Sequence, residues 1–243
     1  MRVATVGLCG SDVHIAVEGV TPTPYLPITL GHEIAGTVAA LGAAVGDWDV
    51  AARVCVFPLT FDGTCAACLA GHSEICLRRR AIGIHRDGGL AEYVAVPARN
   101  LCAVPDGVPF DQASICTDAV ITPFHALTDV ARLTVGESVA VIGVGGLGLH
   151  AVQIARLAGA SPVIAVDTRP AQLERAAQAG ADVVVDASSA TSVVDAVLAA
   201  TGGVGVDVAA EFIGAQATIA QAVECYALQK SRCEPFAAAY GCE

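Results

Sequence analysis

The stretch that decides the fold runs from Val139 to Gly148 and reads V-A-V-I-G-V-G-G-L-G. Four apolar residues suited to a strand lead directly into a glycine-rich turn, and the residues that follow have helical apolar spacing. Gly143 permits the tight turn, Gly145 lets backbone approach a ligand, and Gly148 lets helix and strand pack closely. Because a helix N-terminus presents unpaired N–H groups, the sequence predicts a phosphate-binding site at this turn.

Strands and helices continue to alternate on the C-terminal side of this turn. Further strands are predicted at 163–166, 183–185 and 206–212, and helices at 148–157, 169–179 and 192–200. Alternation of this kind predicts a parallel, doubly wound sheet of the α/β class.

Asp167 ends the second predicted strand, about twenty residues after the turn. A carboxylate there accepts the hydroxyl groups of an adenosine ribose and repels a 2′-phosphate, which favours NAD over NADP. Arg169 follows closely and would soften that exclusion. The alternative is a purely structural turn with Asp167 as a helix cap. The predicted cofactor-binding residues here are Gly143, Gly145, Gly146, Leu147, Gly148, Asp167 and Arg169.

The N-terminal half has a different pattern. Short strand-like runs at 33–41, 53–59, 91–96 and 101–104 are separated by Gly, Pro and Asp. Their close spacing predicts a compact, mostly β domain. We therefore expect two domains, at 1–120 and 121–243, with a helix near 122–133 at the join.

Composition excludes several classes of partner. The formal net charge is -11, which argues against nucleic acid and against an anionic membrane surface. The longest apolar stretch is rich in Gly and carries polar residues, so it predicts no membrane span. We expect a soluble cytoplasmic protein. In that compartment the ten cysteines indicate metal ligands or free thiols rather than disulfides.

Two motifs in the N-terminal half carry side chains that suit zinc. Residues 7–14 read G-L-C-G-S-D-V-H, and residues 31–36 read G-H-E-I-A-G. A catalytic zinc ion takes three protein ligands and leaves one position open. Together with the glycine-rich turn, these motifs resemble the zinc-containing medium-chain alcohol dehydrogenases, from about Val3 to Ala222. The resemblance implies a GroES-like β domain, a Rossmann domain, and hydride transfer between an alcohol (or its ketone or aldehyde) and NAD(H).

The resemblance also assigns roles near the zinc ion. Cys9 and His32 match the first two catalytic ligands, and Glu33 matches a carboxylate beside the ion that can exchange with water. Asp12 matches the acid that orients the ligand histidine. The third ligand falls on Asp118, as in a bacterial secondary-alcohol branch that uses Asp, with Cys116 as the alternative.

A second metal site is implied by C-x-x-C-x7-C at Cys65, Cys68 and Cys76. Family spacing places the fourth ligand at Asp62. Three thiolates and a carboxylate can close a tetrahedral structural zinc site. The alternative is a lobe that keeps its shape without metal. The remaining cysteines fit no ligand spacing and are expected to be core or surface thiols.

The implied mechanism is oxidation of an alcohol polarised by zinc, with hydride passing to the nicotinamide. A proton relay would run through Ser11, a ribose hydroxyl and His14 to solvent. Thr122 and Leu147 would lie behind the nicotinamide ring. The resulting catalytic set is Ser11, Asp12, His14 and Glu33.

The chain departs from the family pattern at both ends. Cys9 comes early, only four nucleotide-domain strands are predicted, and residues 226–243 are atypical. We therefore expect a truncated chain with little turnover, whose full-length relatives are homo-oligomers acting on a small alcohol or ketone. The alternatives are an inactive nucleotide-binding fragment and a zinc-free quinone reductase of the same superfamily.

Overall fold

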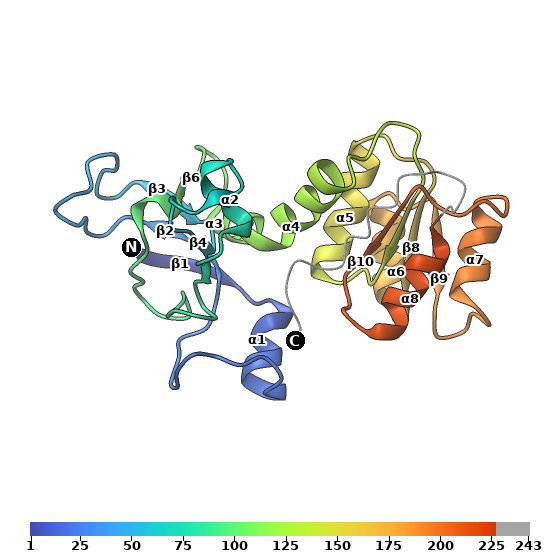
Figure 1. Cartoon of the computed structure of the whole chain (residues 1–243), viewed down its shortest axis with the longest axis horizontal. Helices are drawn as coiled ribbons and strands as arrows, with labels where there is room; N and C mark the ends of the chain where they lie inside the picture. Colours follow the sequence, from blue (N-terminus) through green and yellow to red (C-terminus); the bar gives the residue numbers. More distant parts are fainter. Residues whose placement is uncertain (227–243) are drawn as a thin grey trace. The chain divides into compact units, whose positions relative to one another are not determined.

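The computed structural model describes residues 1–226, so the atypical tail lies outside the described residues beyond Tyr226. The chain forms two compact units, Met1–Ala119 and Val120–Glu243. Figure 1 labels their elements.

The first unit is built on an antiparallel sheet in the order β1-β2-β3-β6. These strands are β1 (Arg2–Gly7), β2 (Glu33–Thr37), β3 (Arg53–Val56) and β6 (Leu101–Ala103). A second, two-stranded sheet pairs β4 (Leu59–Thr60) with β5 (Arg80–Ala81). The sequence predicted one strand across 53–59, but Pro58 divides β3 from β4 because proline has no N–H to donate to a ladder.

One strand of this unit was missed, and one predicted strand was wrong. β1 was not predicted, and the predicted strand at 91–96 forms only an isolated bridge, between Arg2 and Tyr93. Two backbone hydrogen bonds nevertheless hold this segment beside β1, from Val3 N to Glu92 O and from Val94 N to Met1 O.

Short helices complete the first unit: α1 (Gly10–Val13), η1 (His14–Glu18), α2 (Ala66–Leu69), η2 (Ser73–Ile75), η3 (Ala98–Asn100), α3 (Phe110–Ile115) and η4 (Cys116–Val120). α3 packs on the sheet through Ala113, which joins Ala35 and Val104 in a buried cluster. A separate cluster of Ile34, Val56, Ile82 and Val94 fills the other part of the core.

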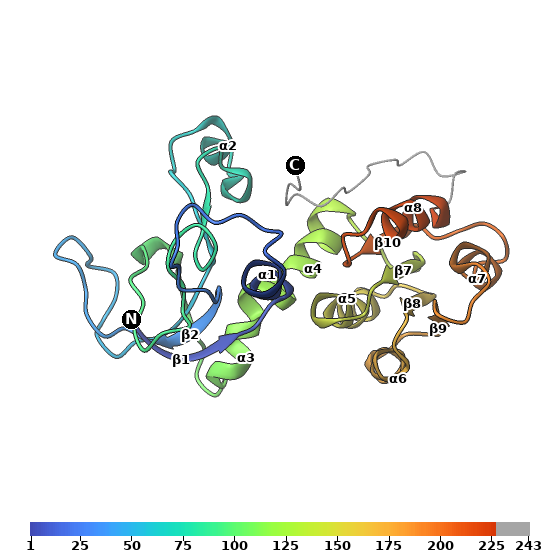
Figure 2. The ribbon, with the colours of Figure 1, turned by 90° about the horizontal axis from the view of Figure 1, so that it is seen from below.

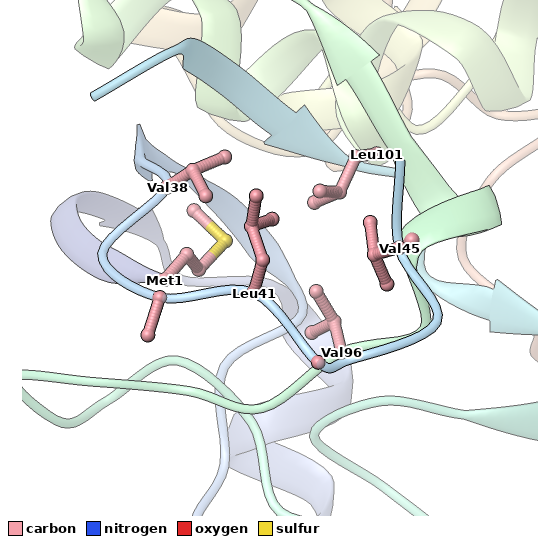
Figure 3. A pocket seen from close by; sticks show the side chains of 9 residues that line it. Met1, Val38, Leu41, Val45, Val96 and Leu101 are labelled. Atoms are coloured by element: carbon pink, nitrogen blue, oxygen red, sulfur yellow. The ribbon is translucent and has the colours of Figure 1, made fainter. Parts of the chain in front are cut away.

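A small pocket lies at one end of this unit, beside the first residue of the chain (Figure 3). Its labelled side chains are all apolar: Met1, Val38, Leu41, Val45, Val96 and Leu101. None of them is a metal ligand or a nucleophile, so this pocket is separate from the sites described below.

The second unit is a parallel sheet in the order β10-β7-β8-β9. Its strands are β7 (Val139–Ile142), β8 (Val163–Asp167), β9 (Val183–Asp186) and β10 (Val208–Glu211). Its helices are α4 (Ile121–His125), η5 (Ala126–Val130), α5 (Gly146–Leu157), α6 (Pro170–Ala179), α7 (Val193–Ala200) and α8 (Gln216–Cys225). The predicted doubly wound α/β architecture is confirmed.

Alternate residues of the central strands face opposite layers of helix. On β7, Val139 and Val141 pack with α5 and α6, whereas Ala140 and Ile142 pack with α7 and α8. Figure 2 shows α5 and α6 on one face of the sheet and α7 and α8 on the other. Both faces are buried, which explains why these strands are apolar throughout. No described helix combines the length and apolar character that a membrane crossing requires.

Candidate metal centre and nucleotide site

Three ligand-type side chains from distant parts of the first unit converge. Cys9 lies just before α1, His32 just before β2, and Asp118 within η4. One ligand atom from each lies within 4.8 Å of the others. Cys116, the alternative third ligand, is exposed and is not part of this group.

The charges in this cluster favour a cation. His32 is buried, and its Nε2 lies 3.2 Å from Oδ2 of Asp118. Burial lowers the pKa of His32, but hydrogen bonds with Asp118 and Cys9 outweigh it and raise the pKa to about 10. A positive charge at the imidazole is therefore stabilised by the two other ligands. A thiolate, an imidazole and a carboxylate also form a donor set that zinc accepts, so the residues fit this metal.

The contacts of Asp12 differ from the expectation that its carboxylate orients the ligand histidine. Its carboxylate accepts hydrogen bonds from the backbone N–H of Cys9 (2.9 Å) and of Gly31 (3.1 Å). The buried Nδ1 of His32 has no hydrogen-bond partner among the described residues, so Asp12 does not hold the imidazole itself. Asp12 lies in the first turn of α1, whose N-cap is Cys9, so its carboxylate is within reach of the Cys9 N–H. Asp12 therefore connects the backbone at the ligand Cys9 with the backbone at Gly31, next to the ligand His32.

Glu33 is buried beside the cluster and accepts a hydrogen bond from the backbone N–H of Ala119, the residue after Asp118 (3.1 Å). Burial and the negative charge of Asp118 raise the pKa of Glu33. A Cβ atom at Gly7 would come within 1.8 Å of Oε2 of Glu33, so β1 leaves room for this side chain. Glu33 thus connects β2 to the segment that carries the third ligand.

The two residues of the expected proton relay lie on consecutive short helices. Oγ of Ser11 is 3.8 Å from Sγ of Cys9, which places the hydroxyl at the cluster. His14 is exposed, and its Nδ1 lies 2.7 Å from Oε2 of Glu18. Ser11 therefore faces the ligands while His14 faces solvent.

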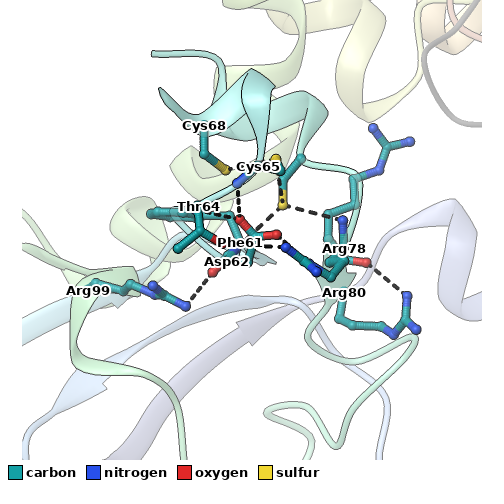
Figure 4. A network of polar contacts seen from close by, with 10 residues as sticks. Phe61, Asp62, Thr64, Cys65, Cys68, Arg78, Arg80 and Arg99 are labelled. Atoms are coloured by element: carbon teal, nitrogen blue, oxygen red, sulfur yellow. Dashed lines mark hydrogen bonds and ion pairs between the residues drawn. The ribbon is translucent and has the colours of Figure 1, made fainter. Parts of the chain in front are cut away.

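A second cluster lies on the lobe between β4 and β5 (Figure 4). It contains Asp62, Cys65, Cys68 and Cys76, whose ligand atoms lie within 4.8 Å of one another. Sγ of Cys65 is 3.6 Å from Sγ of Cys68 and 3.8 Å from Sγ of Cys76. Backbone N–H groups of Cys68 and Leu77 lower the pKa of Cys65 to about 7, which favours a thiolate. The residues fit a zinc ion.

Sequence reasoning missed the partner of Asp62. Its Oδ1 accepts hydrogen bonds from the backbone N–H of Thr64 and Cys65, and Nε of Arg78 donates to its Oδ2 (2.6 Å). No spacing rule connects an arginine to a carboxylate sixteen positions earlier, so only the folded lobe reveals this ion pair.

The glycine-rich turn has the expected conformation. Gly143 has a φ of +84°, which disfavours other residues, and a Cβ at Gly148 would come within 1.9 Å of O of Gly143. Gly145 is the N-cap of α5, and Gly146 and Leu147 are its first residues. The turn follows β7 at the reversal of strand order between β7 and β10, where ligands bind in open sheets of this type.

Asp167 lies beside this turn. Its Oδ2 accepts a hydrogen bond from the backbone N–H of Val144 (3.0 Å), and its Oδ1 accepts bonds from N and Nε of Arg169. Burial opposes ionisation, but the bonds from Arg169 and Val144 outweigh it and lower the pKa of Asp167. Asp167 does not cap α6, whose N-cap is Arg169. Thr122 lies in α4 of the same unit and is half-buried.

Two family models match the two halves of the chain. Residues 1–106 match the alcohol dehydrogenase GroES-like domain, and residues 146–230 match the zinc-binding dehydrogenase domain. The chain belongs to the zinc-dependent medium-chain alcohol dehydrogenase family. The family membership expected from the sequence motifs is thereby confirmed.

The relatives that the chain resembles are longer than the chain itself. L-galactonate-5-dehydrogenase of Escherichia coli K12 is 38% identical over 181 residues, covering 73% of this chain and 51% of the relative. L-threonine 3-dehydrogenase of Saccharopolyspora erythraea is 34% identical over 228 residues, covering 92% and 65%. A structure described as a zinc-binding dehydrogenase of Sinorhizobium meliloti 1021, bound to NADP, is 36% identical with a TM-score of 0.83, covering 93% and 65%. The chain thus spans about half to two thirds of the length of these relatives.

Proposed function

We propose that this chain is the zinc and nucleotide-binding part of a dehydrogenase that transfers hydride between a secondary alcohol, or its ketone, and NAD(H). The observation that carries the proposal is the convergence of Cys9, His32 and Asp118 in a unit that precedes a dinucleotide-type turn. In domain terms, residues 1–120 would supply the zinc chemistry and residues 121–243 the cofactor site.

Each residue near the first cluster has a separate task in this proposal. A zinc ion held by Cys9, His32 and Asp118 would supply Lewis acidity that makes an alcohol more acidic. Ser11, whose hydroxyl lies beside the Cys9 sulfur, would accept the alcohol proton and release its own hydroxyl proton. His14 hands that proton to solvent, because it is exposed and bound to Glu18.

The cofactor proposal rests on Asp167. Its ionised carboxylate lies at the end of β8, beside the glycine-rich turn, where an adenosine ribose would bind. Arg169 shares that carboxylate and is exposed, so it is available to a 2′-phosphate as well. We therefore propose a preference for NAD that Arg169 weakens. Gly143, Gly145, Gly146 and Gly148 would shape the phosphate site, with Leu147 and Thr122 on the nicotinamide side.

Substrate class follows from the chemistry that the relatives' names describe. Position 5 of L-galactonate and position 3 of L-threonine both carry a secondary hydroxyl group. We propose a small secondary alcohol or ketone as substrate, a homo-oligomeric full-length protein, and a cytoplasmic location. The location is supported by free thiols at every described cysteine, since a reducing compartment preserves them.

Turnover and binding measured together test this function. When the purified chain is loaded with zinc and mixed with NAD and a panel of secondary alcohols, we expect a low rate of NADH formation that a metal chelator abolishes. NAD binding without NADH formation would support the alternative of a nucleotide-binding protein without turnover. Turnover that survives zinc removal would support the zinc-free quinone reductase alternative and contradict the proposal.

The cofactor preference has its own test. Asp167→Ser should weaken NAD binding by about tenfold, equivalent to about 1.4 kcal/mol, and reduce the bias against NADP. Arg169→Ala is the matched variant and should increase that bias. Fluorescence titration of both nucleotides measures these changes, and tighter binding of NADP than NAD by the unaltered chain would contradict the preference.

A further inference from the structure

Two cysteines outside both ligand clusters lie directly opposite each other in the first unit. In the antiparallel ladder of β3 and β6, Cys55 is the register partner of Cys102. Sequence spacing gave these thiols no role, because 55 and 102 are brought together only by the pairing of the two strands. Side chains of directly opposed residues point to the same face of a sheet.

The ladder places this pair at a separation suited to a disulfide. Phe57 N donates to Asn100 O and Val104 N donates to Arg53 O. The pairs Phe57/Asn100 and Arg53/Val104, two positions away on either side, are therefore hydrogen-bonded pairs. Because such pairs alternate along an antiparallel ladder, Cys55 and Cys102 form one too, with Cα atoms about 5.5 Å apart. Disulfides form between Cα atoms about 4.4–6.8 Å apart.

The two thiols also differ in exposure and in pKa, as formation of a disulfide through an oxidised cysteine requires. Cys102 is exposed on β6, the edge strand of the sheet, so a small oxidant can reach it. Cys55 is half-buried against the cluster of Ala35, Val104 and Ala113, so it is less accessible than Cys102. A hydrogen bond from Cys55 lowers the pKa of Cys102 to about 6 and raises that of Cys55. The exposed sulfur is therefore the nucleophile and the buried one is the resolving thiol.

We propose that Cys55 and Cys102 are a peroxide-sensitive dithiol that closes to a cross-strand disulfide and reopens with a thiol reductant. The Cys102 thiolate attacks hydrogen peroxide, so that an S–O bond forms, the O–O bond breaks, and hydroxide leaves as water after taking a proton. The Cys55 sulfur then attacks Cys102, so that the S–S bond forms while the S–O bond breaks and a second water leaves. Two thiols are oxidised, and one peroxide is reduced to two waters.

The bond would enclose the metal-ligand lobe. The lobe cluster from Asp62 to Cys76 lies between Cys55 and Cys102 in the sequence, so the disulfide closes a loop around it. Closing a long loop restricts the unfolded chain, which stabilises the folded unit. The oxidised first unit should therefore unfold at a temperature at least about 3 °C higher than the reduced one.

Peptide mapping of the full chain tests the proposal. The chain is loaded with zinc, so that the thiols of both ligand clusters are occupied, and is treated with a small excess of hydrogen peroxide. Digestion with trypsin, and with chymotrypsin under conditions that cleave only after aromatic residues, places Cys55 in fragment 54–61 and Cys102 in fragment 100–110, each free of other cysteines. We expect these two fragments to be joined in most molecules, and dithiothreitol to separate them.

Variants distinguish this pair from its neighbours. Cys102→Ser should abolish the joined fragment and the increase in unfolding temperature, whereas Cys116→Ser, which removes another exposed thiol of the same unit, should change neither. Oxidation of the lobe cysteines first, a link from Cys55 to Cys116, or over-oxidation of Cys102 without a link would each overturn the proposal. Because the map uses the unaltered chain, it decides the matter even where a variant fails to fold.

Discussion

The two ligand clusters of the first unit are assembled in opposite ways. Asp62, Cys65, Cys68 and Cys76 lie within one short lobe, where backbone N–H groups and Arg78 already hold the ligands. Cys9, His32 and Asp118 come from three separate elements and meet only when the sheet and η4 are in place. A local cluster depends on its own loop, whereas a cluster from distant segments depends on the whole unit.

This difference also separates their tasks. The lobe offers four ligand side chains, which would occupy all four coordination positions of a tetrahedral ion and leave none for a substrate. The distant cluster offers three ligand side chains with the Ser11 hydroxyl beside them, so a fourth position stays available. The first arrangement suits structural support and the second suits chemistry.

The largest expected effect comes from breaking the distant cluster. Cys9→Ser should remove about one zinc ion per chain and reduce dehydrogenase activity by more than about a hundredfold, because the substrate position is lost with the metal. Zinc bound at the lobe should remain. Elemental analysis and NADH absorbance measure the two results, and loss of all zinc would show that the clusters are not independent.

Breaking the lobe should affect stability more than chemistry. Cys68→Ser should also remove about one zinc ion, and should lower the unfolding temperature of the first unit by several degrees. Binding of zinc at the distant cluster should persist, because its ligands lie on other elements. Calorimetry with metal analysis checks this, and an unchanged unfolding temperature would favour a lobe held by Arg78 and Asp62 without metal.

A pH titration of zinc-free protein should sharpen the contrast. The pKa of His32 is raised above its ordinary value to about 10, so its pairing with Asp118 stabilises the folded state fully below about pH 6.5. That stability is lost as pH rises through 10. The unfolding temperature of the zinc-free chain should therefore fall between about pH 7 and pH 10. His32→Asn should show a smaller fall, and an equal fall in both proteins would assign the effect to other groups.

The smallest effect is expected from exchanging the third ligand. Asp118→Cys should keep zinc at the distant cluster, since thiolate is also a zinc ligand, whereas Asp118→Ala should lose it. Cys116→Ser is the matched control and should retain both zinc and activity, because Cys116 is exposed and outside the cluster. Zinc loss on changing Cys116 alone would make it the third ligand.

Prediction from sequence succeeded where structure is local. Strands β7, β8 and β9 and the helices between them follow from apolar runs, a glycine turn at Gly143 and stop signals such as Gly180. It failed in the first unit, where β1 was missed and the run at 91–96 forms one bridge. Strands of that unit are defined by pairing with distant segments, and no local pattern reports whether a partner is present.

The sequence by itself determined the family, the doubly wound unit and the types of ligand, because ligand chemistry and turn conformation depend on residue type and short spacing. Only the tertiary structure decided how those residues act on one another. In the folded chain the Asp12 carboxylate accepts bonds from backbone N–H groups instead of the imidazole, and Arg78 pairs with Asp62. Cys55 lies opposite Cys102 in the sheet. The physical reason is that these contacts join residues through strand register and loop closure, which the whole unit fixes and no short stretch encodes.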